Sequence, residues 1–447
     1  MTTIAMDGAA KAAPQGMRTF LVIWIGQLIS MLGSGLTSFA LGVWIFDQTG
    51  EATPFALTVL FGNLPRILLL PVAGSLADRW NRRWIMILSD VGNALVTISV
   101  FAMLLFGNLE FWHIYLIVTL GSVFSAFQEP AYTASVTMLV PKKDLSRANG
   151  MTQMGQALEM VITPVIAGVL FVLIGLSGIL VIDFVTFLFA VGTLLIVRIP
   201  QPKLTEQAEK KPSVWVDARF GWSYLKARPG LFGLLWYYAM VNFLLSWSGV
   251  LMGPMILSRY PASTLGTIQM FFGFGMLAGG ILSSIWAGPK RRIRAVIGFI
   301  GLALVGMCIA GLRPSPVTIG AGLFVMMTFI PLASASSNAL FQSKVAPEVQ
   351  GRVFSIRAMI SRAVMPVGYL LAGPLADRVF NPLLETDGAW TNTFLGLLLD
   401  TGAGRGIGFM FVASALVGIV VSILAYAHPR IRNIEDELPD ALPASAD

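Results

Sequence analysis

The chain has 447 residues, of which 56% are hydrophobic and only 12% carry a charge, and its mean hydropathy is +0.77. This balance excludes a soluble globular domain and indicates a polytopic membrane protein. The net charge of +7 does not indicate a nucleic-acid partner, because the basic residues are spread loop by loop and do not form one patch.

Apolar runs long enough to cross a hydrocarbon layer about 30 Å thick as helices recur along the whole chain. The alternation typical of membrane strands is absent. The first run has no small-residue cleavage site after it, so we expect it to remain as a helix. We predict twelve transmembrane helices, at residues 19–46, 54–76, 84–106, 111–139, 151–174, 177–197, 231–258, 263–287, 295–312, 315–343, 353–376 and 406–427.

The spacing of these runs predicts two six-helix bundles, at 19–197 and 231–427, after an N-terminal tail at 1–18. The segment 198–230 is polar and is expected to link them. Its second part, "VWVDARFGWSYLKARPG", is typical of an amphipathic helix with Trp215, Phe220 and Trp222 at the membrane surface. The acidic, proline-containing tail at 428–447 is expected to be disordered.

The loops that alternate along this arrangement differ in basic residues, which are retained on the cytoplasmic side. With the N-terminus inside, the inner segments hold 23 of the 30 basic residues. The outer loops hold four: Arg259, Arg313, Arg378 and Arg405. We therefore predict a multi-pass protein of the cell membrane with both termini in the cytoplasm.

Two similar stretches stand in different places. "AGSLADRWNRR" (73–83) matches "GGILSSIWAGPKRR" (279–292) at an offset of 206 residues, with Ser284 in the position of Asp78. An offset close to half the chain indicates an internal repeat of two pseudo-symmetric halves. "AGPLADR" (372–378) lies at the outer end of its helix, so we expect its function to differ from that of the stretch at 73–83 on the cytoplasmic side.

The first of these stretches resembles the signature of the major facilitator superfamily between helices 2 and 3. Its residues here are Gly74, Asp78, Arg79, Arg82 and Arg83, with Asn81 in place of a glycine. More narrowly, "FQEPAYTASVTMLVP" (127–141) and "PVGYLLAGPLADRVFNP" (366–382) look like the macrolide-efflux branch of the drug:proton antiporters. The resemblance implies an all-α fold of twelve helices that works by alternating access.

Other classes of function lack their motifs. The chain has no Gly-x-x-x-x-Gly-Lys-Ser/Thr loop for ATP and no His-Glu-x-x-His zinc motif. His113 and His428 are far apart near helix ends, and Cys308 is the single cysteine. We expect neither enzymatic activity nor a cofactor or metal.

Ionisable groups at membrane depth are costly in hydrocarbon and mark candidate sites. These are Arg66, Asp90, Glu129, Glu159, Asp183, Arg357 and Arg362. Asp90 and Asp183 lie nearer helix ends, where an interfacial or capping role is an equal alternative. Glu129 is deep beside Pro130, on a helix that lines the cavity in the resembling family. We predict proton coupling by Glu129, with Glu159 in reserve and Arg66 as counter-charge; a purely structural Arg66–Glu129 pair is the alternative.

The predicted function is proton-coupled efflux of amphipathic drugs such as macrolide-like antibiotics. We expect Gln27, Asn242, Asn338 and Arg362 to line the substrate cavity. The expected partners are the small amphipathic substrate, protons and membrane lipid, and the protein is expected to be a monomer. The alternatives are a facilitator or symporter for a small polar nutrient and a non-transporting membrane scaffold.

Gly74, Asp78, Arg79, Arg82 and Arg83, together with Arg357, form a predicted gating motif. We expect this motif to latch the cytoplasmic gate shut. The helix at 353–376 begins on the cytoplasmic side, and a helix N-terminus carries partial positive charge. We expect Asp78 to dock there, near Arg357, when the cavity opens outward.

Overall fold

The computed structural model describes residues 16–141, 144–197, 199, 214–286, 289 and 291–441. These residues are almost entirely helical, and no β-strand occurs among them. The helices are α1 (Met17–Thr49), α2 (Ala52–Arg79), α3 (Arg82–Leu105), α4 (Phe111–Leu139), α5 (Leu145–Ile196), α6 (Val214–Lys226), α7 (Pro229–Leu257), α8 (Ala262–Ile285), α9 (Arg292–Leu312), α10 (Pro316–Lys344), α11 (Pro347–Ala363), α12 (Met365–Leu375), the π-helical η3 (Ala376–Phe380), α13 (Asn381–Leu384), α14 (Phe394–Leu399), α15 (Arg405–Ala427), α16 (Pro429–Arg432) and α17 (Ile434–Glu437).

Eleven helices of the described chain are long and apolar enough to cross a membrane. One of them, α5, has 52 residues, more than twice the length that a bilayer requires. It is interrupted at Gly175, whose φ of 65° is not helical and favours glycine. Counting its two parts separately gives twelve spans, which confirms the predicted number, and most predicted boundaries lie within three residues of those observed.

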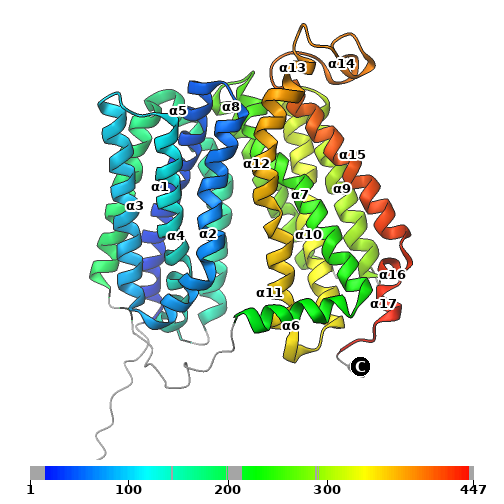
Figure 1. Ribbon diagram of the computed structural model, residues 1–447. Helices are drawn as coiled ribbons and strands as arrows, with labels where there is room; N and C mark the ends of the chain where they lie inside the picture. Colours follow the sequence, from blue (N-terminus) through cyan, green and yellow to red (C-terminus); the bar gives the residue numbers. More distant parts are fainter. Residues whose placement is uncertain are drawn as a thin grey trace, which may run out of the picture. The chain divides into compact units, whose positions relative to one another are not determined.

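The helices pack as two compact units. Unit 1 takes its residues from Met1–Thr37, Phe61–Glu159 and Ser177–Ala208, and unit 2 from Ser38–Leu60, Met160–Leu176 and Glu209–Asp447. Two segments of the predicted first bundle therefore pack with the second. Within unit 2 we call the end of the bundle where α7 begins the linker end, and the opposite end, which carries α13 and α14, the far end (Figure 1).

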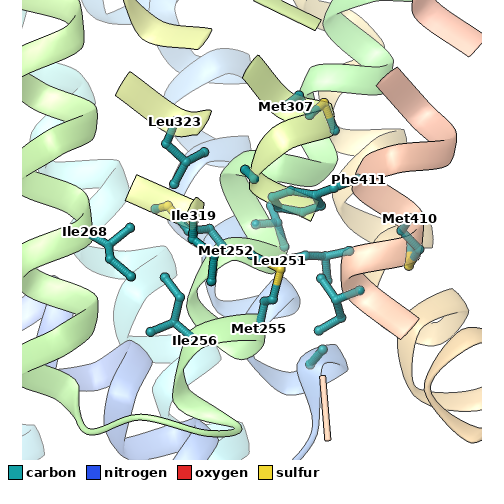
Figure 2. Packing of buried hydrophobic residues seen from close by; sticks show 14 of the residues in the cluster. Leu251, Met252, Met255, Ile256, Ile268, Met307, Ile319, Leu323, Met410 and Phe411 are labelled. Atoms are coloured by element: carbon teal, nitrogen blue, oxygen red, sulfur yellow. The ribbon is translucent and has the colours of Figure 1, made fainter. Parts of the chain in front are cut away.

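The core of unit 2 is apolar and rich in methionine. Leu251, Met252 and Met255 of α7 are buried with Met307 of α9 and Phe411 of α15, and Figure 2 shows these side chains converging between the helices. Unbranched methionine fills irregular gaps where several helices meet. Hydrocarbon outside the protein is as apolar as this core, so close packing rather than the hydrophobic effect holds the helices together.

Glycines allow α5 and α8 to approach closely within unit 2. A Cβ on Gly266 would lie 2.2 Å from the carbonyl oxygen of Pro164, and one on Gly168 would lie 2.6 Å from that of Ala262. Farther along the same contact, a Cβ on Gly273 would lie 2.8 Å from a methyl of Val161. The contact is therefore formed by backbone against backbone, as small residues permit in membrane helices.

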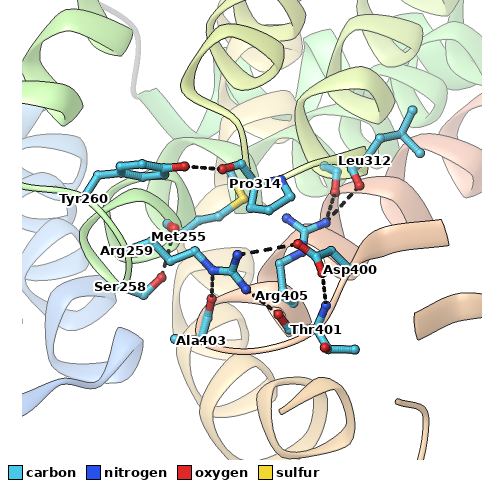
Figure 3. Close-up of polar contacts among 11 residues, drawn as sticks. Met255, Ser258, Arg259, Tyr260, Leu312, Pro314, Asp400, Thr401, Ala403 and Arg405 are labelled. Carbon is cyan, nitrogen blue, oxygen red and sulfur yellow. Dashed lines mark hydrogen bonds and ion pairs between the residues drawn. The ribbon is translucent and has the colours of Figure 1, made fainter. Parts of the chain in front are cut away.

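A polar cluster fixes the loop at the far end of unit 2 (Figure 3). Arg405 is 1% exposed and donates to the carbonyl oxygens of Gly311 and Leu312 at 2.8 and 3.0 Å. Arg259 donates to the carbonyl of Ala403 at 2.9 Å and pairs with Asp400. The carbonyls at the end of α9 are among the four that a helix leaves without intrahelical donors. The buried Arg405 supplies hydrogen-bond donors to two of them.

The start of the C-terminal tail is folded, which differs from the expectation of a disordered segment at 428–447. Glu435 of α17 accepts hydrogen bonds from the backbone N–H groups of Arg292 and Ile293 at 3.0 and 3.1 Å. The buried Lys344 donates to the carbonyls of Glu435 and Leu438 and pairs with Asp440. The physical reason is that the tail satisfies the N-terminus of α9 and a buried ammonium group, both distant in sequence.

The predicted amphipathic helix is present as α6. It packs on α11, where a Cβ on Gly221 would lie 2.8 Å from the carbonyl oxygen of Arg352. The guanidinium of Arg352 lies 5.2 Å from the ring centre of Phe220, whereas Trp222 is 37% exposed. The structure therefore gives Phe220 a protein contact, while Trp215 belongs to the residues whose side chains it does not describe.

Candidate functional site

The charged groups at mid-membrane in unit 1 form an ion pair. Arg66 lies at the middle of α2 and donates from both Nε and Nη2 to Glu129 Oε2 of α4, the Nε bond measuring 3.2 Å. Their side chains are 50% and 48% exposed, and Arg66 also interacts electrostatically with Glu159 of α5. A half-exposed pair at this depth needs water around it, so these residues line an aqueous surface of unit 1.

A second acid, Asp90 of α3, is fully buried, with 0% exposure. Its carboxylate accepts hydrogen bonds from two amides, Gln27 of α1 at 3.1 Å and Gln128 of α4 at 2.6 Å. The Gln128 amide also donates to the Gln27 carbonyl oxygen at 2.8 Å. The three side chains thus form a closed ring that ties three helices together.

A third acid, Asp183, lies in the second part of α5 and is 1% exposed. Its partners are hydroxyl groups: Thr37 at 2.7 Å, Thr97 at 3.1 Å and Ser34 at 3.4 Å. Asp183 therefore joins α5 to α1 and α3 through hydroxyls, where Asp90 uses amides.

The gating motif between α2 and α3 is partly described. Asn81 has an extended backbone and its side chain caps α3, accepting from the N–H groups of Arg83 and Trp84. Arg82 donates to the carbonyl of Ala134 at 2.8 Å. Arg83 donates to the carbonyls of Leu194 and Leu195. These contacts join α3 to the ends of α4 and α5. At Gly74, Asp78 and Arg79 the structure describes only the backbone, so the docking of Asp78 stays a prediction.

Arg357, the expected partner of that latch, is held within unit 2. It donates to Ser337 and Asn338 of α10 at 2.8 and 3.0 Å. Its guanidinium lies 4.3 Å from the ring centre of Phe341 and 5.5 Å from that of Tyr238. The cation is thus stabilised by aromatic faces and by two oxygen acceptors.

A concave surface lies beside this arginine. It has a volume of about 390 Å³ and is lined by residues of α8 and α10: Met276, Met327, Ile330, Pro331, Ser334, Ala335 and Asn338. Because the Asn338 carbonyl oxygen accepts from Arg357, its amide N–H₂ can donate to a ligand. The surface therefore offers flexible apolar contacts and one hydrogen-bond donor.

The other predicted cavity residues are scattered. Gln27 belongs to the Asp90 ring, Asn242 is half-buried on α7, and Arg362 is exposed on α11. The structure thus brings only Asn338 into the concave surface.

The second copy of the motif makes a contact that its sequence did not predict. Asp377 accepts from the backbone N–H groups of Ala52 and Thr53 at 2.9 and 2.7 Å, and from the Thr53 hydroxyl at 2.6 Å. The carboxylate therefore caps the N-terminus of α2 from 324 residues away. A Cβ on the neighbouring Gly373 would lie 2.5 Å from the Thr53 Cα, so the two backbones are in close contact here.

Sequence reasoning missed Gln128 and the three hydroxyl partners of Asp183. Gln128 directly precedes Glu129 in the apolar α4, and this polar pair was the available signal. The hydroxyls carried no such signal, because serine and threonine are common in membrane helices where they bond to the preceding turn.

The Major Facilitator Superfamily model matches residues 23–369 of the chain. Macrolide efflux protein A of Streptococcus pyogenes is 30% identical over 375 residues, covering 80% of this chain and 90% of the relative. The protein of that name from Enterococcus faecalis is 31% identical over 332 residues, covering 71% and 99%.

Among solved structures, a bacterial homologue of the human lysosomal transporter Spinster has a TM-score of 0.68 and 16% identity, covering 97% of this chain and 100% of its own. At that identity the likeness concerns the fold alone. Together with the twelve spans, these matches make the protein a multi-pass membrane transporter and not an enzyme. The chain belongs to the Major Facilitator Superfamily.

Proposed function

We propose that this protein exports amphipathic compounds, such as macrolide-like antibiotics, in exchange for protons. It does so from the cell membrane as a monomer surrounded by lipid, with both termini in the cytoplasm. The orientation rests on the distribution of basic residues along the loops, and the substrate class on the relatives named for macrolide efflux.

The observation that carries the proton coupling is the half-exposed pair of Arg66 and Glu129. A carboxylate beside a cation is favoured in its charged form, and loss of that cation makes protonation more favourable. Glu129 can therefore take up a proton when Arg66 withdraws and release it when the pair forms again. Glu159 lies within the field of the same arginine and is the reserve group.

The concave surface on α8 and α10 supports an amphipathic substrate. Its methionines and Ile330 contact apolar parts, and Asn338 donates to an ether, carbonyl or hydroxyl oxygen. A small polar nutrient requires several convergent polar groups, and this surface supplies few. A non-transporting scaffold has no use for an exposed charge pair at membrane depth, which costs folding free energy.

The test is efflux from proteoliposomes with and without an imposed pH gradient, using a radiolabelled macrolide. Glu129→Gln keeps the shape of the side chain and removes its titration. We expect gradient-driven transport to fall to the level of protein-free liposomes, while substrate exchange without a gradient continues. Glu110→Gln is the matched control, because Glu110 directly precedes the same helix and is exposed at its N-terminus.

Three results would change the proposal. Full gradient-driven transport in Glu129→Gln together with its loss in Glu159→Gln moves the coupling to α5. Retention in both variants rejects coupling through these acids. Transport of the macrolide that ignores the pH gradient in the unmodified protein rejects proton exchange altogether.

A further inference from the structure

The described contacts of Asp90 are the side-chain amides of Gln27 and Gln128. Neither of these contacts supplies a positive charge. The charged side chains on α3 and on the helices around it are either near helix ends or in contact with groups other than Asp90. On α1 and α4, Arg18, Asp47 and His113 are near helix ends and Glu129 is paired with Arg66. On α3, Arg82 and Arg83 donate to backbone carbonyls. On α5, Arg147 is near the start of the helix, Asp183 has its hydroxyls, and Glu159 lies in the field of Arg66.

The geometry around Asp90 fits the ionised form. Each carboxylate oxygen accepts one amide N–H, at 2.6 Å from Gln128 and 3.1 Å from Gln27. The remaining acceptor of the ring, the Gln27 carbonyl oxygen, is used by Gln128 at 2.8 Å. In the part of the chain that the structure describes, the groups that contact the carboxylate are therefore both donors.

A proton on Asp90 would break this ring. The protonated oxygen becomes a donor, and an amide nitrogen cannot accept. One glutamine must rotate to present its carbonyl oxygen, and the Gln128–Gln27 bond is lost when it does. Protonation thus changes contacts between α1, α3 and α4, although only a single O–H bond forms and no other covalent bond changes.

Asp183 lacks this property. Its partners Ser34, Thr37 and Thr97 carry hydroxyls, each of which can act as donor or acceptor by rotation about the C–O bond. A proton there can be accommodated without moving a heavy atom. Two of its three partners, Thr37 and Thr97, are buried and Ser34 is half-buried, whereas both partners of Asp90, Gln27 and Gln128, are half-buried.

We propose that Asp90, with Gln27 and Gln128, is a second proton-binding site of this transporter, whose loading opens the amide ring between α1, α3 and α4. The proposal rests on the proton exchange proposed above. Gln128 and Glu129 are adjacent on α4, so this one helix carries both the amide that contacts Asp90 and the acid that pairs with Arg66.

The first measurement is infrared spectroscopy of the purified full-length protein at a series of pH values. We expect the C=O stretch of a protonated carboxylic acid to appear on acidification, and one component of it to be missing in Asp90→Asn. Asp183→Asn is the matched control and should keep that component. Loss of the component in Asp183→Asn, with retention in Asp90→Asn, would overturn the proposal.

The second measurement is the number of protons exchanged per macrolide in proteoliposomes. Asp90→Asn is expected to exchange one proton fewer than the unmodified protein, and Asp183→Asn the same number. If the unmodified protein exchanges none, the proposed function itself fails. If it exchanges protons and Asp90→Asn exchanges as many, the second site alone is rejected.

Asp90→Asn places an amide against two amide donors and could prevent folding. Gln128→Leu leaves the acid in place and removes one donor, so it provides an independent test. The pH midpoint of the Asp90 band should then move relative to the unmodified protein, while Gln153→Leu, at an exposed site on α5, should leave it in place. An unchanged midpoint in Gln128→Leu contradicts the assignment.

Discussion

Two carboxylates in unit 2 each cap the N-terminus of a helix, at opposite ends of the bundle. Asp377 caps α2 at the far end, and Glu435 caps α9 at the linker end. Each supplies oxygen acceptors to two backbone N–H groups that have no partner within their own helix. Each also places negative charge at the positive end of a helix dipole.

The two caps differ in what they connect. Glu435 joins the tail to a helix of the same half of the chain, and both remain in that half throughout any transport cycle. Asp377 joins η3 of the second half to α2 of the first half. Alternating access requires the halves of the chain to separate at one end and then at the other. We therefore expect the same kind of cap to be a permanent support at Glu435 and a releasable latch at Asp377.

The largest expected effect is that of Asp377→Asn, which removes the charge and one of two acceptor oxygens. Hydrogen bonds to charged groups contribute about 1.5–3 kcal/mol, so opening of the far end should increase about tenfold or more. The measurement is the alkylation rate of a cysteine placed at the buried Ala56, after the native Cys308 is changed to serine. An unchanged rate would show that the cap does not restrain this end.

Thr53→Val should have a smaller effect in the same assay. It removes the hydroxyl that donates to Asp377 at 2.6 Å and keeps the two backbone donors. A neutral donor of this kind contributes about 1 kcal/mol, so we expect alkylation at position 56 to rise about fivefold. Thr58→Val serves as the comparison, because the Thr58 hydroxyl donates to the carbonyl of Pro54 in the preceding turn of α2. Equal rates in the two valine variants would contradict the latch.

Glu435→Gln should have the smallest effect on opening. It removes hydrogen bonds to a charged group, which contribute about 1.5–3 kcal/mol, but this cap joins two segments of the same half of the chain. We expect a slightly lower midpoint of thermal unfolding in detergent and no change in alkylation at position 56. An increase in alkylation as large as that of Asp377→Asn would remove the distinction between support and latch.

Features set by neighbouring residues were predictable from the sequence. The spans follow from local apolar runs, and the break in α5 follows from Gly175. Arg66 was expected to pair with one of the deep acids, and it does so with Glu129. A basic residue at the middle of a membrane span can pair only with the few acids at a similar depth, so few pairings are possible.

Features set by the rotation of helices were not predictable. Asp90 was equally compatible with an interfacial carboxylate, because nothing in the sequence places Gln27 and Gln128 on the faces that meet it. The folded tail was missed because Glu435 and Lys344 satisfy groups far away in the chain. Asn81 stands where the family signature has a glycine, and nothing in the sequence indicates that its side chain caps α3 from an extended backbone.

The glycine contact between α5 and α8 limits how this transporter can evolve. Every single-nucleotide change of a glycine codon that alters the amino acid adds a Cβ, and at Gly266 that atom would lie 2.2 Å from a carbonyl oxygen of α5. Variants at this contact will be purged for their effect on folding before their effect on transport can be selected. With substrate bound at the proposed surface on α8 and α10, we expect adaptation to new compounds at positions such as Met276 and Met327, where side chains can be exchanged without moving a helix.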